Sequence, residues 1–501
     1  MKYLVGLLLL CCLAAAGHSA VASLLIVNAR VIDGTGAPAA LRSVRIRGST
    51  IEALGNLKAR KDEAVFDAGG LILAPGFIDT HSHHDRGLDE HPEATAVVSQ
   101  GITTIVIGQD GSSADSLAAM FDKLRTHPVA INIASFVGHN TVRSAAMGDD
   151  FKRLATPAEI ERMRALVETG MKDGALGLST GLEYDPGHYS NTAEILELAK
   201  VASRYGGRYA SHIRSEDHDL WQAVDELVEI GRVAHMPVLY SHMKLAMVGW
   251  WGQNAKLIEK LEAARRSGVD LSGDVYPYDF WHATLSVMFP KRDFSNRESA
   301  ARALETVAPA DGLRLSWYTP DQSLAGKTVA EIAAARNTDN VTTLIDLVLK
   351  AEAPGQSASV MGTSMRGDDI DALVLWPGAN ICSDGAMDSR HPRGTGTFTR
   401  VLRDYVRERK LLTWEAAIHK MTEEAASHVG ITGRGVIRRG LAADLVLIDP
   451  VTVSDRSSIA DPTALSVGIE RVWVNGVVVF AQGSPTGARS GVPILHPPRA
   501  P

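Results

Sequence analysis

The chain has 501 residues, of which 45% are hydrophobic, 22% are charged and 3 are cysteines. Nearly half of the side chains can be buried in a core, which excludes a disordered, collagen-like or disulfide-stapled protein. The formal net charge of −7 and the lack of a long basic run argue against a nucleic-acid partner, and the length favours one large domain with an accessory one.

The N-terminal segment 1–22 has the pattern of a signal peptide. Lys2 precedes an apolar run over residues 4–17 that is too short to span a bilayer comfortably, and Ala20-Val21-Ala22 suits cleavage before Ser23. A buried N-terminal helix is the alternative interpretation. We expect an exported protein, periplasmic or secreted, without stable membrane insertion. Cleavage would leave one cysteine in the mature chain and therefore no intramolecular disulfide.

Short strand-like runs occur near both ends of the chain. LLIVNARVID and SVRIRGSTIEALG lie close to the N-terminus, and ADLVLIDP and RVWVNGVVVF lie close to the C-terminus, with Asn475-Gly476 as a strong hairpin signal. Two sets of strands at opposite ends can pair to form one small β-sandwich. Its predicted halves are 23–73 and 436–490, followed by a Pro-rich tail, 491–501, that is disordered or lies on the surface.

The middle of the chain, 74–435, alternates apolar strand-like runs with amphipathic helices. The runs are short, nearly continuously apolar and rich in branched residues, as expected for strands buried on both faces. This α/β pattern predicts a (β/α)8 TIM-like barrel, with a doubly wound open sheet as the alternative. A stretch at about 284–377 is too long for one crossover and is predicted to be an insertion. The eight runs begin at Gly76, Thr103, Val129, Gly174, Arg208, Pro237, Val269 and Ala379.

Histidines and carboxylates stand at the predicted carboxyl ends of these runs, where barrel enzymes carry their reactive groups. Neutral imidazole and carboxylate are ligands of a borderline cation such as Zn²⁺. Four histidines and one aspartate exceed the needs of one tetrahedral ion, so a second ion and a bridging group are expected. The candidates are His81 and His83 on the first run, Glu183 beyond the fourth as the bridge, His212 and His242 on the fifth and sixth, and Asp384 on the eighth.

Several longer stretches are characteristic as well: APGFIDTHSHHD, GITTIVIGQDG, DGALGLSTGLEYDPG, SHIRSE, SHMK, DVYPY, SDGAMDSRHPRGTGTF and GRGVIRRGLAADLVLIDP. They resemble the amidohydrolase superfamily and, within it, the D-aminoacylase or N-acyl-D-amino-acid deacylase group, over essentially the whole mature chain. The resemblance implies a deeper metal site from His81, His83 and Asp384 and a second from His212 and His242. It also implies Zn²⁺, with one or two ions per chain and two preferred.

The sequence departs from the family pattern at the metal bridge. Well-known D-aminoacylases carry a bridging Cys in an Asn-Cys-Gly turn after strand two, whereas this chain has Gln109-Asp110-Gly111. Other members of the superfamily bridge through a strand-four group, often a carboxylated Lys, and Glu183 stands at about that place. We therefore predict Glu183 as the bridge, with Asp110 as the second candidate. Cys382 is expected to pack near the metal without ligating it.

The expected mechanism is metal-dependent hydrolysis of an amide. The metal lowers the pKa of a bound water and polarises the scissile carbonyl, while Asp384 takes the proton of the water and delivers it to the departing nitrogen. The resemblance points to Lys244, Tyr276 and Arg393 as the groups that hold the substrate carboxylate. The sequence does not decide between Tyr276 and Tyr278, and we favour Tyr276.

These observations predict a zinc-dependent, exported hydrolase that acts on a small molecule, an N-acyl-D-amino acid. A dipeptidase that cleaves L-Xaa-D-Xaa dipeptides would use the same site. A cyclic amidase of the hydantoinase or dihydroorotase kind matches the SDG…HPR stretch less well. A non-catalytic scaffold would be expected to have lost ligands, whereas this sequence retains them. The oligomeric state and the preferred side chain are left open.

Overall fold

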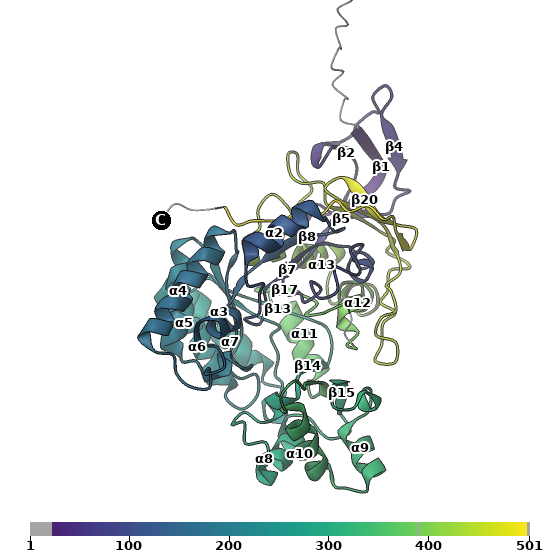
Figure 1. The fold of residues 1–501 in the computed structure, drawn as a ribbon. Coiled ribbons are helices and arrows are strands. Elements are labelled where there is room, and N and C mark those ends of the chain that lie inside the picture. The colour runs from purple at the N-terminus through teal and green to yellow at the C-terminus, as the bar shows by residue number, and fades with distance from the viewer. Residues whose placement is uncertain (1–22, 388–389, 498–501) are drawn as a thin grey trace, which may run out of the picture.

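The computed structural model describes residues 23–387 and 390–497. Figure 1 shows a central barrel, a β-rich part built from both ends of the chain, and a separate unit around α8, α9 and α10 at the opposite end of the molecule. The predicted signal peptide, 1–22, lies outside the described residues. Among the described residues, no helix is both long and apolar enough to cross a membrane.

The barrel consists of eight parallel strands in sequence order. Neighbouring strands pair in parallel, the third strand is interrupted at Phe136, and a parallel bridge between Ser82 and Gly385 joins the last strand to the first. The predicted (β/α)8 barrel is therefore confirmed. The strands are β6 (Phe77–Asp79), β7 (Ile102–Ile107), β8 (Asn132–Ser135) with β9 (Val137–Gly138), β10 (Gly177–Gly181), β11 (Arg208–His212), β12 (Val238–Tyr240), β13 (Leu271–Val275) and β17 (Ala379–Ile381).

Helices surround the barrel because each carries an apolar stripe towards the strands. In α4, Met163, Val167 and Met171 are buried at a spacing of four residues. The same helix begins with a capping box in which Thr156 and Glu159 satisfy each other's backbone N–H groups. The barrel helices are α1 (Thr95–Val98), α2 (Leu117–Thr126), α3 (His139–Met147), α4 (Pro157–Lys172), α5 (Thr192–Arg204), α6 (Leu220–Ala234), α7 (Asn254–Arg266), α11 (Gly367–Leu375), α12 (Arg393–Arg400), α13 (Trp414–Met421) and α14 (Glu423–Val429).

Strands from both ends of the chain form one nine-stranded sheet. The predicted β domain, built from the two chain ends, is therefore present. Antiparallel pairing of β5 with β18 joins the two halves, and Asn475-Gly476 forms the predicted hairpin turn, both residues having positive φ. Trp473 is fully buried in the core of this sheet. The strands are β1 (Ser23–Val31), β2 (Ala40–Arg47), β3 (Thr50–Gly55), β4 (Ala64–Asp67), β5 (Ile72–Pro75), β18 (Leu445–Ile448), β19 (Ile469–Val474), β20 (Val477–Ala481) and β21 (Ser484–Pro485).

The C-terminal segment lies on the surface of the barrel as an extended chain. Gly491 N donates to Val129 O at 2.9 Å, Ile494 N donates to Ile133 O at 2.8 Å, and His496 N donates to Gly174 O at 2.9 Å. These bonds fix the described part of the Pro-rich tail beside β8.

Between β13 and β17 the chain leaves the barrel and forms a small α+β unit. Its three strands are antiparallel in the order β14-β16-β15. The unit begins at Phe280, slightly before the predicted position 284, whereas α11 contacts α7 and β17 and so belongs to the barrel. The elements of the unit are β14 (Phe280–Thr284), α8 (Arg297–Thr306), β15 (Leu313–Tyr318), α9 (Val329–Arg336), α10 (Asn340–Ala351) and β16 (Ala358–Thr363).

A buried polar network links the sheet to the barrel. Asp444 lies just before β18 and is paired with the guanidinium of Arg434. It also accepts hydrogen bonds from Asn132 Nδ2 of β8, at 3.1 Å, and from Asn475 N, at 2.7 Å. Because every partner is buried or half-buried, loss of this carboxylate would leave donors and one cation unsatisfied.

We expect Asp444→Ala to lower the free energy of unfolding by about 3–5 kcal/mol, the usual effect of removing one partner of a buried ion pair. Thermal unfolding followed by circular dichroism measures the change. Asp461→Ala, at an exposed position of the same C-terminal region, is the matched control and should stay within about 0.5 kcal/mol of the parent. Equal stability of the two variants would contradict a structural role for the network.

Candidate active site

The carboxyl ends of the barrel strands bring all the predicted ligands to one place. His212 ends β11, and the other side chains follow within a few residues of a strand end, where parallel strands of a barrel converge. The groups that meet there are His81, His83, Asp110, Glu183, His212, His242 and Asp384.

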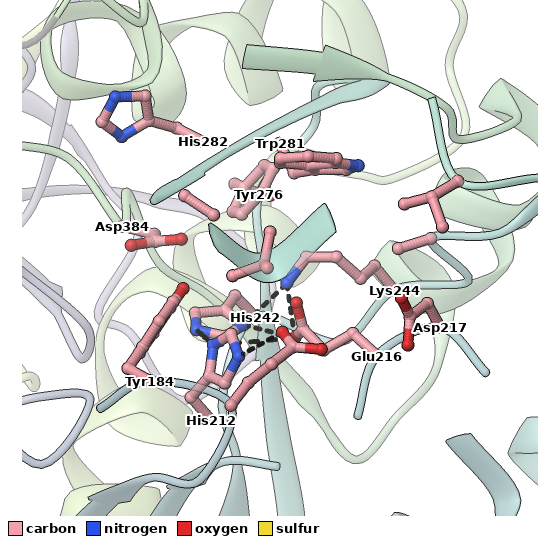
Figure 2. A pocket seen from close by; sticks show the side chains of 15 residues that line it. Tyr184, His212, Glu216, Asp217, His242, Lys244, Tyr276, Trp281, His282 and Asp384 are labelled. Atoms are coloured by element: carbon pink, nitrogen blue, oxygen red, sulfur yellow. Dashed lines mark hydrogen bonds and ion pairs between the residues drawn. The ribbon is translucent and has the colours of Figure 1, made fainter. Parts of the chain in front are cut away.

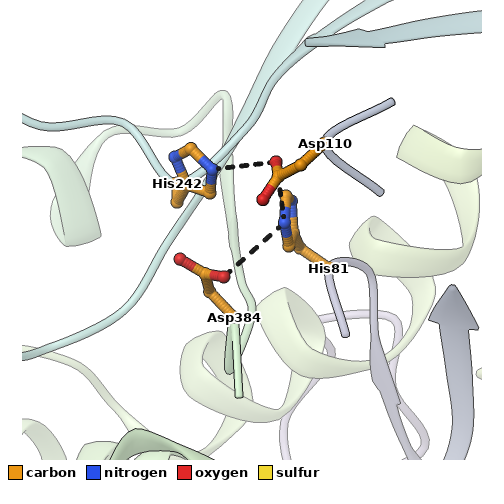
Figure 3. A group of neighbouring side chains, drawn as sticks. All are labelled: His81, Asp110, His242 and Asp384. Atoms are coloured by element: carbon orange, nitrogen blue, oxygen red, sulfur yellow. Dashed lines mark hydrogen bonds and ion pairs between the residues drawn. The ribbon is translucent and has the colours of Figure 1, made fainter. Parts of the chain in front are cut away.

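Asp110 lies at the centre of this group. Its Oδ1 is 3.3 Å from both His81 Nε2 and His242 Nε2, and its Oδ2 is 3.2 Å from His83 Nε2. Figure 3 shows the carboxylate between His81 and His242, with Asp384 facing His81 from the other side. Burial alone would raise the pKa of Asp110, but the neighbouring imidazoles outweigh it and hold the pKa well below its usual value.

A second group adjoins the first through His242. His212 Nδ1 lies 3.2 Å from His242 Nε2, and Glu216 Oε1 lies 3.0 Å from His242 Nδ1. Lys244 Nζ donates to the same Glu216 oxygen at 2.6 Å. Glu216 was not predicted as a site residue, although the SHIRSE stretch places it four residues after His212.

Glu183 occupies a more peripheral position than Asp110. Its Oε2 lies 2.9 Å from His212 Nε2, and burial raises its pKa. Asp110 approaches three imidazoles, whereas Glu183 approaches one. The geometry thus reverses the expected order of the two bridge candidates and favours Asp110.

Three residues of the cluster turn the backbone sharply at the strand ends. Asp110, His242 and Asp384 have φ values of 53°, 37° and 48°. Each such conformation costs about 1–3 kcal/mol and tends to persist where function requires it. Gly111 continues the first of these turns with φ 74°, and a Cβ there would lie 2.6 Å from Asn140 Oδ1. The turns direct the side chains of these residues into the cluster.

The predicted carboxylate-binding groups converge around Tyr276. The centroid of its ring lies 4.8 Å from Arg393 Cζ and 5.8 Å from Lys244 Nζ. The Tyr276 hydroxyl is buried and has no hydrogen-bond partner among the described residues, whereas Tyr278 donates to Pro392 O at 3.4 Å. Arg393 Nη1 also lies 2.7 Å from Asp384 Oδ2. A buried hydroxyl without a partner, next to two cations, suits an anionic group of a ligand.

Lys244 and Tyr276 line a pocket between the cluster and the inserted unit, together with His212, His242 and Asp384, whereas Arg393 lines a neighbouring pocket. Figure 2 shows Lys244 and Glu216 at one end, Asp384 and His282 at the other, and Trp281 beside Tyr276. Tyr184, another residue that was not predicted, packs its ring 4.4 Å from that of His212. Cys382 is buried, which raises the pKa of its thiol well above the usual value, and it belongs to neither group of candidate ligands.

The arrangement suits divalent cations. His81, Asp110, His242 and Asp384 form one group of converging ligand atoms, and His212, Glu216 and His242 form another. Nε2 of buried His81 makes no hydrogen bond among the described residues, and it faces the carboxylate oxygens of Asp110 and Asp384 at 3.3 and 3.7 Å, as expected of an imidazole nitrogen that shares a metal with them. The donors are nitrogen and oxygen throughout, the ligands of Zn²⁺ and similar ions.

Comparisons with known proteins agree with this geometry. A model of the amidohydrolase family matches residues 299–480. The chain is 36% identical to the N-acyl-D-glutamate deacylase of Alcaligenes xylosoxydans xylosoxydans, over 92% of this chain and 94% of the relative. It is 34% identical to the D-aminoacylase of the same organism, over 93% and 96%.

A solved structure is similar over the same range. It is the N-acyl-D-glutamate deacylase of Bordetella bronchiseptica, complexed with zinc and a phosphonate inhibitor that mimics the tetrahedral intermediate of the reaction. The TM-score is 0.85 and the identity 35%, with 94% of this chain and 99% of that one covered.

Substitution of the two bridge candidates should affect metal content differently. We expect two divalent ions per chain in the parent protein, one or none in Asp110→Ala, and the parental content in Glu183→Ala. Asp110 contacts three imidazoles, including that of His242, which both groups share, whereas Glu183 contacts His212. Elemental analysis after gel filtration measures the ions, and circular dichroism controls for folding. Loss of metal from Glu183→Ala alone would restore Glu183 as the bridge.

Proposed function

Because this chain belongs to the amidohydrolase superfamily, in its D-aminoacylase and N-acyl-D-amino-acid deacylase group, we propose that it hydrolyses N-acyl-D-amino acids to a carboxylic acid and a D-amino acid. One observation carries the proposal. The cluster of imidazoles and carboxylates lines the same pocket as the buried hydroxyl of Tyr276, which has no hydrogen-bond partner among the described residues, so a reactive centre and an anion site share one pocket.

Zn²⁺ is the proposed metal, held by nitrogen and oxygen donors alone. When bound, such an ion lowers the pKa of a coordinated water and polarises a carbonyl oxygen. Asp110 would be shared between two ions, and Glu216 would orient His242 through its Nδ1, as carboxylates commonly do for metal-binding histidines. The proposed ligands are His81, His83, Asp110 and Asp384 for one ion and Asp110, His212 and His242 for the other.

Asp384 is the proposed general base and general acid. Burial raises its pKa, but Arg393, His242 and His83 outweigh burial and hold the pKa well below the usual value. The carboxylate is therefore ionised at neutral pH and can accept a proton from the attacking water. Arg393 holds Oδ2, while Oδ1 faces His83 at 3.5 Å. The proton then passes from Asp384 to the departing amide nitrogen.

Lys244 and Tyr276 are the proposed anchors of the substrate carboxylate. Lys244 donates one of its three N–H groups to Glu216 Oε1, at 2.6 Å, which leaves N–H groups for the substrate. The free hydroxyl of Tyr276 supplies a second donor. Fixing the carboxylate at this end of the pocket orients the scissile amide towards Asp384.

A dipeptidase acting on L-Xaa-D-Xaa is the second candidate, because the bond is the same and a second, open pocket lies beyond Asp384. Arg86, Trp317 and Arg390 line that pocket, which leaves room for an acyl group larger than acetyl. Parallel rates on acetyl-D-amino acids and L-Xaa-D-Xaa dipeptides separate the two activities.

Asp384→Asn should lower kcat about 10²–10⁴-fold, the usual contribution of a positioned acid or base. The amide keeps the shape of the side chain but cannot accept the proton. Release of the D-amino acid from an N-acetyl-D-amino acid measures the rate, and elemental analysis with circular dichroism should show retained metal and fold. Full activity of Asp384→Asn would overturn the assignment.

Export is a further part of the proposal, supported by the charged start, apolar run and small residues of segment 1–22. Expression in a bacterial host should yield an extracytoplasmic protein whose N-terminal residue is Ser23 by mass spectrometry. A full-length protein confined to the cytoplasm would contradict export.

A further inference from the structure

The turn that carries Asp384 is held at three successive backbone N–H groups. Asp384 has a φ of 48°, a conformation that persists only where the surroundings enforce it. Its own N–H donates to His81 O at 2.9 Å. On either side, Ser383 N donates to Asp79 Oδ1 at 2.8 Å and Gly385 N donates to Ser383 Oγ at 3.0 Å. These bonds leave the proposed base little freedom to turn away from the cluster.

Asp79, the last residue of β6, holds this turn through a single serine. Its Oδ1 accepts the N–H of Ser383, and its Oδ2 accepts the hydroxyl of the same residue. Hydrogen bonds to a carboxylate are about twice as strong as those between neutral groups. Because the Ser383 hydroxyl also accepts from Gly385 N, Asp79 acts on the chain both before and after Asp384.

Asp79 cannot touch a substrate, because its side chain is completely buried. A carboxylate in such a position is costly unless hydrogen bonds replace those lost to water. The two bonds from Ser383 supply this compensation. An apolar side chain would fill the same space without the cost, so the carboxylate is explained by the residue that it holds.

The same turn packs against the residue that carries the partner of Asp384. A Cβ on Gly385 would lie 2.3 Å from Gly394 Cα, so the close approach of the two chains requires glycine. Gly394 O lies 2.7 Å from His84 Nε2. Gly394 follows Arg393, whose Nη1 lies 2.7 Å from Asp384 Oδ2. A shift of the turn would therefore also change the distance between the proposed base and its cation.

A buried carboxylate holds a second candidate ligand in a comparable way. His242 has a φ of 37°, and its N–H donates to Oδ1 of Asp274, a fully buried residue of β13. Asp274 Oδ2 accepts from Thr80 Oγ1 at 3.1 Å. Asp79 and Asp274 belong to neither group of candidate ligands, so they form a supporting layer behind the ligands.

From these contacts we infer that Asp79 is a positioning residue, which acts through Ser383 to orient the Asp384 carboxylate towards the metal and the departing nitrogen. The inference rests on the proposed function, in which Asp384 is both a metal ligand and the general base and acid. Removal of the groups that orient metal ligands commonly lowers metal affinity or activity about 10–100-fold.

Asp79→Asn tests this role with little change of shape. An amide in either orientation can accept only one of the two bonds from Ser383. With N-acetyl-D-methionine and saturating Zn²⁺, kcat should fall about 10–100-fold. KM should stay within about 3-fold of the parent, because Lys244 and Tyr276 still anchor the substrate. An unchanged kcat would overturn the inference, and so would a rise in KM as large as the fall in kcat, which indicates a general disturbance of the site.

Ser383→Ala tests the route by which Asp79 acts. It should lower kcat at least about 10-fold, and parental kcat would overturn the inference even if Asp79→Asn does not fold. The double variant should lose no more than about 3-fold beyond the weaker single variant, because both changes break the same connection. Multiplication of the two losses would show that Asp79 acts by another route.

Ser272→Ala is the matched control for loss of a buried hydroxyl. Ser272 lies on β13, and its hydroxyl donates to Val238 O at 3.4 Å, away from the Asp384 turn. This variant should keep the parental kcat and KM. Circular dichroism should show the parental fold in each variant whose kinetics are compared.

Zn²⁺ affinity separates failure of this inference from failure of the proposed function, because its measurement does not depend on turnover. In competition with a chelator, the ion next to Asp384 should bind at least about 10-fold more weakly in Asp79→Asn than in the parent, while the other ion keeps its affinity. Absence of hydrolysis by the parent would refute the proposed function. In that case, parental affinities for both ions in Asp79→Asn would overturn the positioning role as well.

Discussion

The site depends on the balance of charge around the Asp110 carboxylate. Several imidazoles and carboxylates share a buried space at the barrel mouth, where an unpaired charge is costly. Each carboxylate faces at least one imidazole or cation: Asp110 faces three histidines, Asp384 faces Arg393, and Glu216 faces Lys244. Hydrogen bonds with Asp110 and Asp384 outweigh burial and raise the pKa of His83 to about 9. A raised pKa means that the imidazole of His83 carries an extra proton at neutral pH. Bound divalent cations would supply the positive charge in place of that proton.

The barrel supplies the rigidity that this crowding requires. The side chains enter the cluster from sharp turns with positive φ at Asp110, His242 and Asp384, and such turns are stable only when the surroundings enforce them. Hydrogen bonds across the strand ends do so: Asp384 N donates to His81 O at 2.9 Å, His83 N donates to Gly385 O at 2.8 Å, and Asp274 accepts from His242 N. The ring of strands therefore closes at the level of the ligands.

The barrel could be predicted from sequence because its strands are buried on both faces and so form continuous apolar runs. The strand ends then located His81, His83, His212, His242 and Asp384 without further information. The sequence could not predict which carboxylate, Asp110 or Glu183, lies among the imidazoles. The position of Asp110 depends on a positive φ that directs this loop side chain inward. Glu216 and Tyr184 were missed because each follows a residue already assigned to the site, His212 and Glu183, in the loop after its strand.

The inserted unit was the least predictable part of the chain. Its central strand β16 pairs with β14 on one side and with β15 on the other, so residues far apart in sequence form the small sheet. Short strands of this kind leave only a weak pattern, and their partners cannot be identified from local propensity. Ala283, Val287 and Val307, which line the pocket beside the cluster, belong to this unit.

The pairing of β5 with β18 also governs the order in which the molecule can be completed. Synthesis delivers β1 to β5 first, yet the edge of β5 obtains its partner only when Leu445–Ile448 have emerged. For most of translation the N-terminal strands therefore form a partial sheet with an open edge, a state prone to pairing with other chains. The barrel strands are encoded between the two halves, so the two ends of the chain can be joined only after all of these strands have been synthesised.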